Sequence, residues 1–192
     1  MIQQLKGKGY TYDAKNDYLT GEFNGSEVNI RIATNNNKVW RIMVTDANPT
    51  RSVTNIKIRY NKLCRQFSNN GKYVPADLVD YAISEDEDIS YEMTVHDKRY
   101  EAVYYQYSET DIDSANMRKW MMEKYGNMYS QEELEKLSET EQQQLLVAVA
   151  MDYLKEVISK KSVWFMIHQF YGEYYITMFY DNEYNHSDGE DL

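Results

Sequence analysis

The feature that most constrains the fold is a pair of short extended segments joined by Asn24-Gly25. Asn-Gly favours the two-residue turn that connects neighbouring antiparallel strands. In the segment that follows, Val28, Ile30 and Ile32 alternate with polar residues, so this strand is apolar on one side only. Three asparagines at 35–37 then turn the chain into a further alternating segment. The pattern predicts an antiparallel meander with one face against a core.

A helical pattern follows the meander, from about residue 50 to residue 68. Apolar residues recur there at spacings of three and four: Val53, Ile56, Tyr60, Leu63, Cys64 and Phe67. Asn69-Asn70-Gly71 predicts the end of this helix, as glycine does for the shorter segment IQQLKGKG at the start of the chain. The pattern places Cys64 on the buried face. We therefore expect Cys64 to be a structural thiol. Because it is the only cysteine, we expect no internal disulfide.

Strand patterns return in the second half of the chain, where two pairs of strands enclose a long helical excursion. The expected strands are 89–96, 99–107, 163–169 and 174–180, the last two joined by a turn at Gly172-Glu173. The excursion runs from about residue 111 to residue 160. Its first stripe is Met117, Trp120, Met121 and Tyr125, and its last helix carries Leu145, Val149, Leu154, Val157 and Ile158. Two capping boxes, Ser130 with Glu133 and Ser138 with Glu141, predict helix starts within it.

These elements predict an α+β fold, with antiparallel sheet and helices packed on one face. The stretches LKGKGYTY and FSNNGKYV both close a helix on glycine and re-enter extended structure through an aromatic residue. Their likeness suggests two tandem α-ββββ units, the second with a helical insertion at 111–160. We expect a single domain over 1–181, with 1–72 and 73–181 as its halves, and an acidic C-terminal segment at 182–192.

The charge balance excludes one class of function. The chain has 21 Lys and Arg residues against 31 Asp and Glu residues, a net charge of −10. Nucleic-acid binding depends on an excess of basic side chains that neutralise phosphates, so we expect no nucleic-acid partner. No stretch approaches the roughly 18 apolar residues needed to cross a bilayer, so the chain is not expected to be transmembrane.

The acidic ending YDNEYNHSDGEDL resembles a calcium loop only in part. Counting from Asp181, Glu183 and Asn185 stand at ligand positions of an EF-hand, but His186 occupies the position that requires glycine. We therefore expect a solvated terminal segment without metal. SEDEDIS at 84–90 lacks a glycine that could fold its carboxylates round an ion, and it is expected to be solvated too, or to dock a basic partner.

No catalytic or cofactor motif stands out. HExxH, GxSxG, the Walker loop and GxGxxG are all absent, so no cofactor is predicted. The histidines are His96, His168 and His186. A hydrolase remains an alternative, because carboxylates distant in sequence can meet in a pocket with His168 or His96.

One surface is a candidate for binding. If Val163, Phe165 and Ile167 face the core, then Trp164, Met166 and His168 lie on the opposite face of the sheet. Tyr175, Thr177 and Phe179 of the facing strand would join them, and Tyr104 or Tyr105 could extend the patch. The candidate surface is Trp164, His168, Tyr175 and Thr177. It can contact a partner protein, or a sugar ring if several of its aromatic rings are exposed and coplanar, or it can be covered by 111–160.

Two stretches carry a resemblance to a known group: DEDISYEMTVHDKRYEAVYYQ at 86–106 and VWFMIHQFYGEYYITMFYDNEYNHSDGEDL at 163–192, with GKGYTYD and GEFNG in support. The chain resembles uncharacterised proteins of gut Bacteroidetes. The resemblance implies export to the periplasm or outside the cell, although the chain itself begins without an apolar signal segment, and a cytoplasmic location is the alternative. It also implies a shape similar to the beta-lactamase inhibitor proteins, whose concave sheet grips another protein.

The functional expectation is therefore a non-catalytic interaction module of a gut bacterium, whose partner is another protein. The alternatives are a glycan-binding protein and a hydrolase. The abundance of tyrosine, 19 residues in 192, suits half-buried sheet faces and binding surfaces alike. The sequence does not predict an oligomeric state.

Overall fold

A computed structural model describes the protein over residues 1–77, 79–106, 114–126 and 137–182. The chain divides into two compact units. The first, the sheet unit, consists of Met1–Gln106 and Lys161–Leu192, and the second, the helical unit, consists of Tyr107–Lys160.

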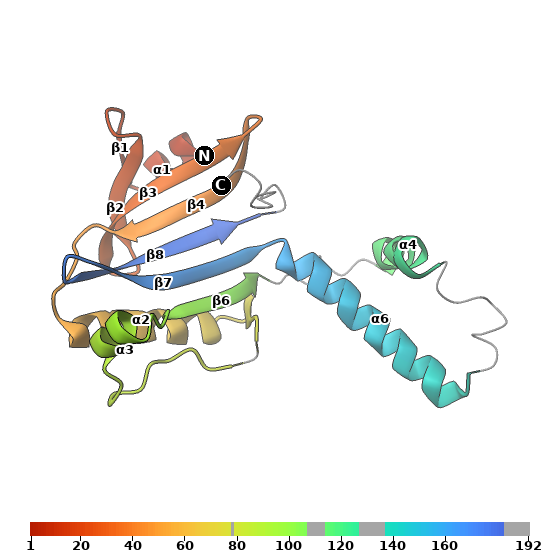
Figure 1. Cartoon of the computed structure of the whole chain (residues 1–192). Coiled ribbons are helices and arrows are strands. Elements are labelled where there is room, and N and C mark those ends of the chain that lie inside the picture. Colours follow the sequence, from red (N-terminus) through yellow and green to blue (C-terminus); the bar gives the residue numbers. More distant parts are fainter. Residues whose placement is uncertain (78, 107–113, 127–136, 183–192) are drawn as a thin grey trace. The chain divides into compact units, whose positions relative to one another are not determined.

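The sheet unit is built on one eight-stranded antiparallel sheet (Figure 1). Its strands are β1 (Thr11–Asp13), β2 (Tyr18–Phe23), β3 (Ser26–Asn35), β4 (Lys38–Asp46), β5 (Tyr73–Pro75), β6 (Glu101–Gln106), β7 (Ser162–Phe170) and β8 (Glu173–Asp181). The helices of this unit are α1 (Ile2–Gly7), α2 (Val53–Ser68) and α3 (Ile89–Val95). The strand order across the sheet is β1-β2-β3-β4-β8-β7-β6-β5. The α+β fold class predicted from the sequence is confirmed.

The strand order contains two meanders that meet in the middle of the sheet. The helix α1 precedes the meander β1 to β4, and α2 precedes the strands β5 to β8. The two sets join where β4 pairs with β8. A helix thus precedes each set of four strands. The second set differs from the predicted one, because β5 was not predicted and α3 replaces the strand expected at 89–96. The helical unit interrupts the second set between β6 and β7.

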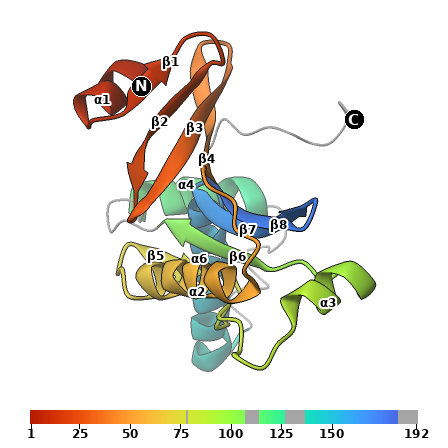
Figure 2. The same cartoon turned by 90° about the vertical axis from the view of Figure 1, so that its left-hand side faces the viewer.

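The core lies between the sheet and the helices on one of its faces, with α2 beside the strands β7 and β8 (Figures 1 and 2). The Ser52 hydroxyl accepts a hydrogen bond from the Asn55 amide and so caps the start of α2. Phe165 of β7 is fully buried, and its ring lies 5.3 Å from the ring of Tyr60 of α2. Cys64 is buried on the same helix, as predicted.

One expected strand is a helix. Residues 89–96 alternate in polarity, yet Ile89–Val95 forms α3. Asp88 caps this helix by accepting a hydrogen bond from the Tyr91 amide, and only Ile89 is fully buried within it. Tyr91 and Val95, which the alternation would place in the core, are more than half exposed. The strand prediction was wrong because Ile89 and Met93 also fit a helical spacing, and the cap favours the helix.

The helical unit contains α4 (Ser114–Tyr125) and α6 (Glu139–Ser159). The capping box predicted at Ser138 and Glu141 is confirmed, because both of its reciprocal hydrogen bonds are present at the start of α6. Within this unit the Trp120 ring of α4 lies 5.4 Å from the Tyr153 ring of α6. The other predicted box, Ser130 with Glu133, lies outside the described residues.

No helix in the described part of the chain is both long and apolar enough to span a membrane.

Candidate binding surface

The face of the sheet opposite α2 carries the residues that the sequence singles out. Along β7, Val163, Phe165 and Ile167 are buried in the core, whereas the residues between them point to the other side and are half-buried. We call that other side the open face. Across β7 and β8 its residues pair in rows: Trp164 with Phe179, Met166 with Thr177, His168 with Tyr175, and Phe170 with Glu173.

The first row holds two stacked rings that stand upright on the sheet. The ring centroids of Trp164 and Phe179 are 4.0 Å apart, and the ring planes differ by 16°. Carbon atoms in contact are about 3.5–4.0 Å apart, so the line between the centroids runs nearly along the ring normals. That line joins neighbouring strands and lies in the sheet. The rings therefore present their edges, and not their faces, to whatever approaches the open face.

An ion pair fixes this end of the open face. The Asp181 carboxylate of β8 accepts two hydrogen bonds from the Arg41 guanidinium of β4, at 2.6 and 2.8 Å. It also accepts one from the Trp164 indole nitrogen, at 3.1 Å. Bidentate pairing with Arg restricts the side chains strongly, and here it holds the indole ring as well. Asp181, which would be the first ligand of a calcium loop, is thus committed to the sheet. Residues 183–192 lie outside the described residues.

The side chains of the second row project less far from the sheet than the rings of the first row. Thr177 is only 7% exposed, and its hydroxyl lies 3.3 Å from the hydroxyl of Thr45 on β4. Of the four candidate residues, Thr177 is therefore the least accessible. Thr177 packs at the base of the open face and contributes little to the surface that a partner can contact. Tyr104, one of the two tyrosines that could extend the patch, is fully buried on the core side, while Tyr105 is half-buried on the open face.

The third row stacks His168 on Tyr175, with centroids 5.1 Å apart and ring planes within 14°. The Nε2 atom of His168 is buried and has no hydrogen-bond partner among the described residues. Burial, followed by the positive charge of Arg99, lowers the pKa of the His168 imidazole from its ordinary value. Burial therefore favours the neutral form of the ring, and the carboxylate that would orient it in a catalytic dyad is not among its partners in the described structure.

Two exposed aromatic residues at the tip of the β7–β8 hairpin extend the open face. Phe170 is 65% exposed and Tyr171 is 89% exposed, and their rings meet edge to face at 4.4 Å. The turn residues are Tyr171 and Gly172, with φ angles of 49° and 74°, so the predicted turn at Gly172-Glu173 is one residue too late. Positive φ is rare for a bulky residue. Only Gly172 suits this turn intrinsically, so Tyr171 is held there at a conformational cost.

Phe170 and Tyr171 are not among the residues predicted for this surface, although the sequence contains a signal for Phe170. The alternation Trp164, Met166, His168 continues to Phe170, which the chain places on the same face one row further. The expected strand ends at residue 169 because the predicted turn is Gly172-Glu173, whereas the turn residues are Tyr171 and Gly172.

The described residues form neither a metal site nor an activated cysteine nucleophile. Among them, no three His, Cys, Asp or Glu side chains gather closely enough to hold a metal ion. His96 is exposed at the end of α3, where its ring meets that of Tyr91 edge to face. Burial raises the pKa of the Cys64 thiol to about 12, so the reactive thiolate is not formed at neutral pH.

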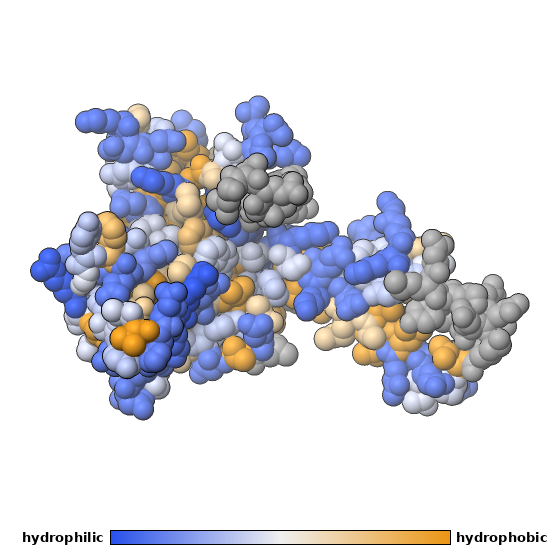
Figure 3. Space-filling view, in the orientation of Figure 1, coloured by the Kyte–Doolittle hydropathy of each residue, from blue (hydrophilic) through white to orange (hydrophobic). Residues whose placement is uncertain are grey.

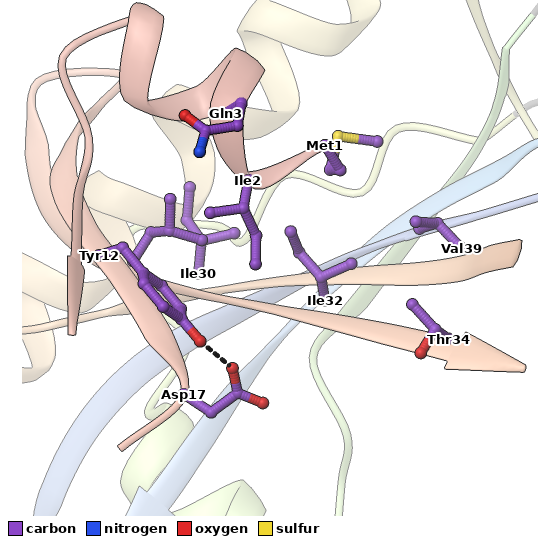
Figure 4. A pocket seen from close by; sticks show the side chains of 10 residues that line it. Met1, Ile2, Gln3, Tyr12, Asp17, Ile30, Ile32, Thr34 and Val39 are labelled. Atoms are coloured by element: carbon purple, nitrogen blue, oxygen red, sulfur yellow. Dashed lines mark hydrogen bonds between the residues drawn. The ribbon is translucent and has the colours of Figure 1, made fainter. Parts of the chain in front are cut away.

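Three pockets lie elsewhere among the described residues of the sheet unit. One, of about 490 Å³, lies between α1 and the first meander, with Ile2, Ile30 and Ile32 among its apolar walls (Figure 4). At its rim the Tyr12 hydroxyl donates a 2.8 Å hydrogen bond to Asp17. The second, of about 350 Å³, lies over the ion pair of Arg59 and Asp46. The third, of about 430 Å³, lies beside α2 and is lined by Cys64 and Asp80 among others. None of the three contains His168 or His96, so none provides the site that the hydrolase alternative requires.

Comparison of the chain with protein-family models, with curated proteins and with solved structures found no match.

Proposed function

We propose that the protein is a non-catalytic binding module that contacts another protein through the open face, with Phe170 and Tyr171 as anchors. The observation that carries the proposal is the hairpin tip, where two large aromatic side chains are mostly exposed and one has a positive φ. Exposed aromatic residues on a rigid support are the residue types that dominate binding energy at protein interfaces.

The rows behind the tip support a protein partner because they are already rigid. His168 and Tyr175 are stacked, and Trp164 is held by both Phe179 and Asp181. A partner that packs on such side chains loses little conformational entropy in ordering them. A rigid open face can therefore bind a partner that presents a large surface, as a protein does.

The ring geometry favours a protein over a sugar. A sugar ring stacks on the flat face of an exposed aromatic ring. Trp164 and Phe179 cover one face of each other and direct their edges outward. His168 and Tyr175 also use one ring face on each other. Ring edges and the half-buried Met166 side chain suit the apolar side chains of a protein better.

The test is affinity capture from a membrane-envelope extract of a gut Bacteroidetes species, the source that the sequence resemblance suggests. The bait is the purified chain with a photo-crosslinking amino acid in place of Tyr175. We expect one protein to be cross-linked reproducibly, and its recombinant form to bind the wild-type chain in calorimetry. Tyr171→Ala should weaken that binding by at least about tenfold, the loss of a single anchor residue.

Tyr91→Ala is the matched control, because Tyr91 is an exposed aromatic residue of the same unit and meets His96 edge to face, as Tyr171 meets Phe170. It lies on α3, away from the open face. Equal loss of binding in both variants would contradict the proposal, as would unchanged binding by Tyr171→Ala. A screen of glycans, run beside the capture, tests the glycan-binding alternative. If a glycan binds the wild type but not Tyr171→Ala, the ligand of the open face is that glycan and not a protein.

A further inference from the structure

Strand β3 continues beyond the strand that covers one of its sides. On one side β4 pairs with it as far as Asn35. On the other side β2 pairs with it only as far as Ile30. Among the described strands, none pairs with β3 on that side beyond Ile30. Residues 32–35 therefore form an uncovered edge of the sheet, which we call the free edge.

The tight turns at both ends of β3 determine where its backbone groups point. The residues of both turns, 24–25 and 36–37, have positive φ angles, as two-residue hairpin turns require. The residues that flank such a turn exchange N–H and C=O hydrogen bonds, and along an antiparallel strand every second residue does so. Ser26 therefore bonds to β2, and Asn35 bonds to β4. The irregularity in the β3–β4 pairing adds Trp40 to β4 and no residue to β3, so the alternation along β3 is unbroken.

The free edge offers unpaired backbone groups. By this alternation Ile32 and Thr34 direct their N–H and C=O groups away from β4, whereas Ala33 bonds to it. None of the four outward groups has a hydrogen-bond partner among the described residues. At the other edge of the sheet, β5 contains Pro75, which has no amide hydrogen to offer. The free edge contains no proline, and its unpaired groups are a template onto which a further strand can add.

An apolar pocket lies next to the free edge. It is the pocket of about 490 Å³ between α1 and the first meander, and both Ile32 and Thr34 line it. Figure 4 shows Ile2 of α1 on one side of this pocket and Ile30 and Ile32 of β3 on the other. In the space-filling view, apolar side chains reach the surface in the region of α1 and β3 (Figure 3). The outward backbone groups and the apolar pocket thus lie side by side.

Together these features specify an extended peptide as the occupant. Residues that pair across neighbouring strands project their side chains from the same face of the sheet. A residue that pairs with Ile32 therefore directs its side chain toward the pocket, as does the next residue but one, which pairs with Thr34. The side chain between them lies on the other face, beside Ala33. The segment that fits has apolar side chains at alternate positions.

We propose that the free edge binds an extended segment of a partner protein by strand addition, with alternate apolar side chains of that segment in the pocket. The free edge and the pocket belong to the first meander, and the pocket lies on the core side of the sheet. The proposal is therefore independent of the open face and of the function proposed for it.

The first test is amide hydrogen exchange of the unbound full-length chain, followed residue by residue by NMR. The Ile32 and Thr34 amides should exchange at least about tenfold faster than the Ala33 amide, which donates to β4. If all three amides are equally protected, the outward groups are already paired and the proposal is wrong.

The second test is an NMR titration with an acetylated and amidated pentapeptide of alternating threonine and valine residues. Saturable shifts should be largest at the amides of Ile32 and Thr34, and exchange of both amides should slow. Two peptide controls separate backbone pairing from apolar contact. Methylation of every peptide nitrogen removes the donors and adds apolar surface, yet it should weaken binding by at least about tenfold. Replacing both valines by serine keeps the backbone groups and should weaken binding by a similar factor.

Two variants of Thr34 give the matched pair on the protein side. Thr34→Pro removes one outward N–H group and should weaken peptide binding by at least about fivefold, the effect of one backbone hydrogen bond. The β3–β4 ladder does not use this group, so the β4 amides should keep their folded spectrum. Thr34→Val keeps the N–H group and should bind the peptide at least as well as the wild type.

Three outcomes would overturn strand addition at the free edge: no saturable shift with the wild type, equal binding of the methylated peptide, or equal weakening by both Thr34 variants. Tyr171→Ala, which tests the open face, should leave peptide binding unchanged. The two proposals can therefore fail separately.

Discussion

The sheet unit and the helical unit bury their apolar side chains to different extents. Helix α2 of the sheet unit has 16 residues and buries Ile56, Tyr60, Leu63, Cys64 and Phe67. Helix α6 of the helical unit has 21 residues and buries only Val149 and Tyr153. Both helices begin at a serine cap. A cap and helix-forming residues thus suffice to define a helix, but only packing against a sheet turns its apolar face into a core.

The largest expected effect distinguishes the core of the sheet unit from its hairpin tip. Phe165 is fully buried between the rings of Tyr60 and Phe67. Phe165→Ala should lower the free energy of unfolding by about 3–5 kcal/mol, because it removes a large ring from a close-packed core. Urea unfolding followed by tyrosine and tryptophan fluorescence measures the change.

Phe170→Ala is the control for this measurement. The same substitution five residues further along β7 removes a ring that is 65% exposed, so it should change the stability by no more than about 0.5 kcal/mol. A similar loss in both variants would mean that the tip is part of the core.

The next effect compares the same cap in the two units. The Ser138 hydroxyl caps α6 and the Ser52 hydroxyl caps α2. Ser138→Ala and Ser52→Ala should each lower the free energy of unfolding by about 1 kcal/mol. For Ser138→Ala, hydrogen exchange should accelerate in α6 and α4 only, whereas for Ser52→Ala it should accelerate across the whole sheet unit, because α2 belongs to its core. Acceleration in the sheet unit after Ser138→Ala would show that the two units unfold together.

A smaller effect should appear as the pH is lowered. The folded protein holds the pKa of His168 below its ordinary value of 6.5, so the unfolded chain binds a proton more readily at this residue. The contribution of neutral His168 to stability is therefore complete above pH 6.5 and is lost as the pH falls through 6.5 toward the lowered pKa. Thermal unfolding at several pH values between 4 and 8 should show this loss.

His168→Gln should reduce the pH dependence, because its side chain does not titrate, while His96→Gln at the exposed end of α3 should leave it intact. A pH dependence that follows His96 instead would contradict the assignment of this effect to the stacked ring.

The smallest effect is expected from removing the helical unit altogether. The Gln106 amide at the end of β6 donates a 2.9 Å hydrogen bond to the Lys161 carbonyl, so the two ends of the excursion are adjacent. Replacing 107–160 by a glycine-serine connection of about 20 residues should leave the stability of the sheet unit within about 1 kcal/mol, since each halving of a closed loop changes its closure free energy by only about 0.6 kcal/mol. A sheet unit that no longer folds would refute its independence.

Much of the fold follows from residue order alone. Alternation through Val28, Ile30 and Ile32 defines a strand with one buried side, and the Asn24-Gly25 turn defines its neighbour. The same reasoning assigned Trp164 and His168 to the face opposite Phe165, and the strand register places them there. These features depend on side-chain period and turn chemistry, which are local properties of the chain.

Only the tertiary structure decided the rest. Residues 89–95 fit a strand and a helix equally well by polarity, and burial of Ile89 with the Asp88 cap selected the helix. Arg41 and Asp181 are 140 positions apart, and they meet because β4 pairs with β8. The exposure of Phe170 and Tyr171 likewise follows from where the hairpin turns. Sequence period fixes which side of an element is apolar, but the contacts between distant elements fix which of those side chains are covered and which remain available to a partner.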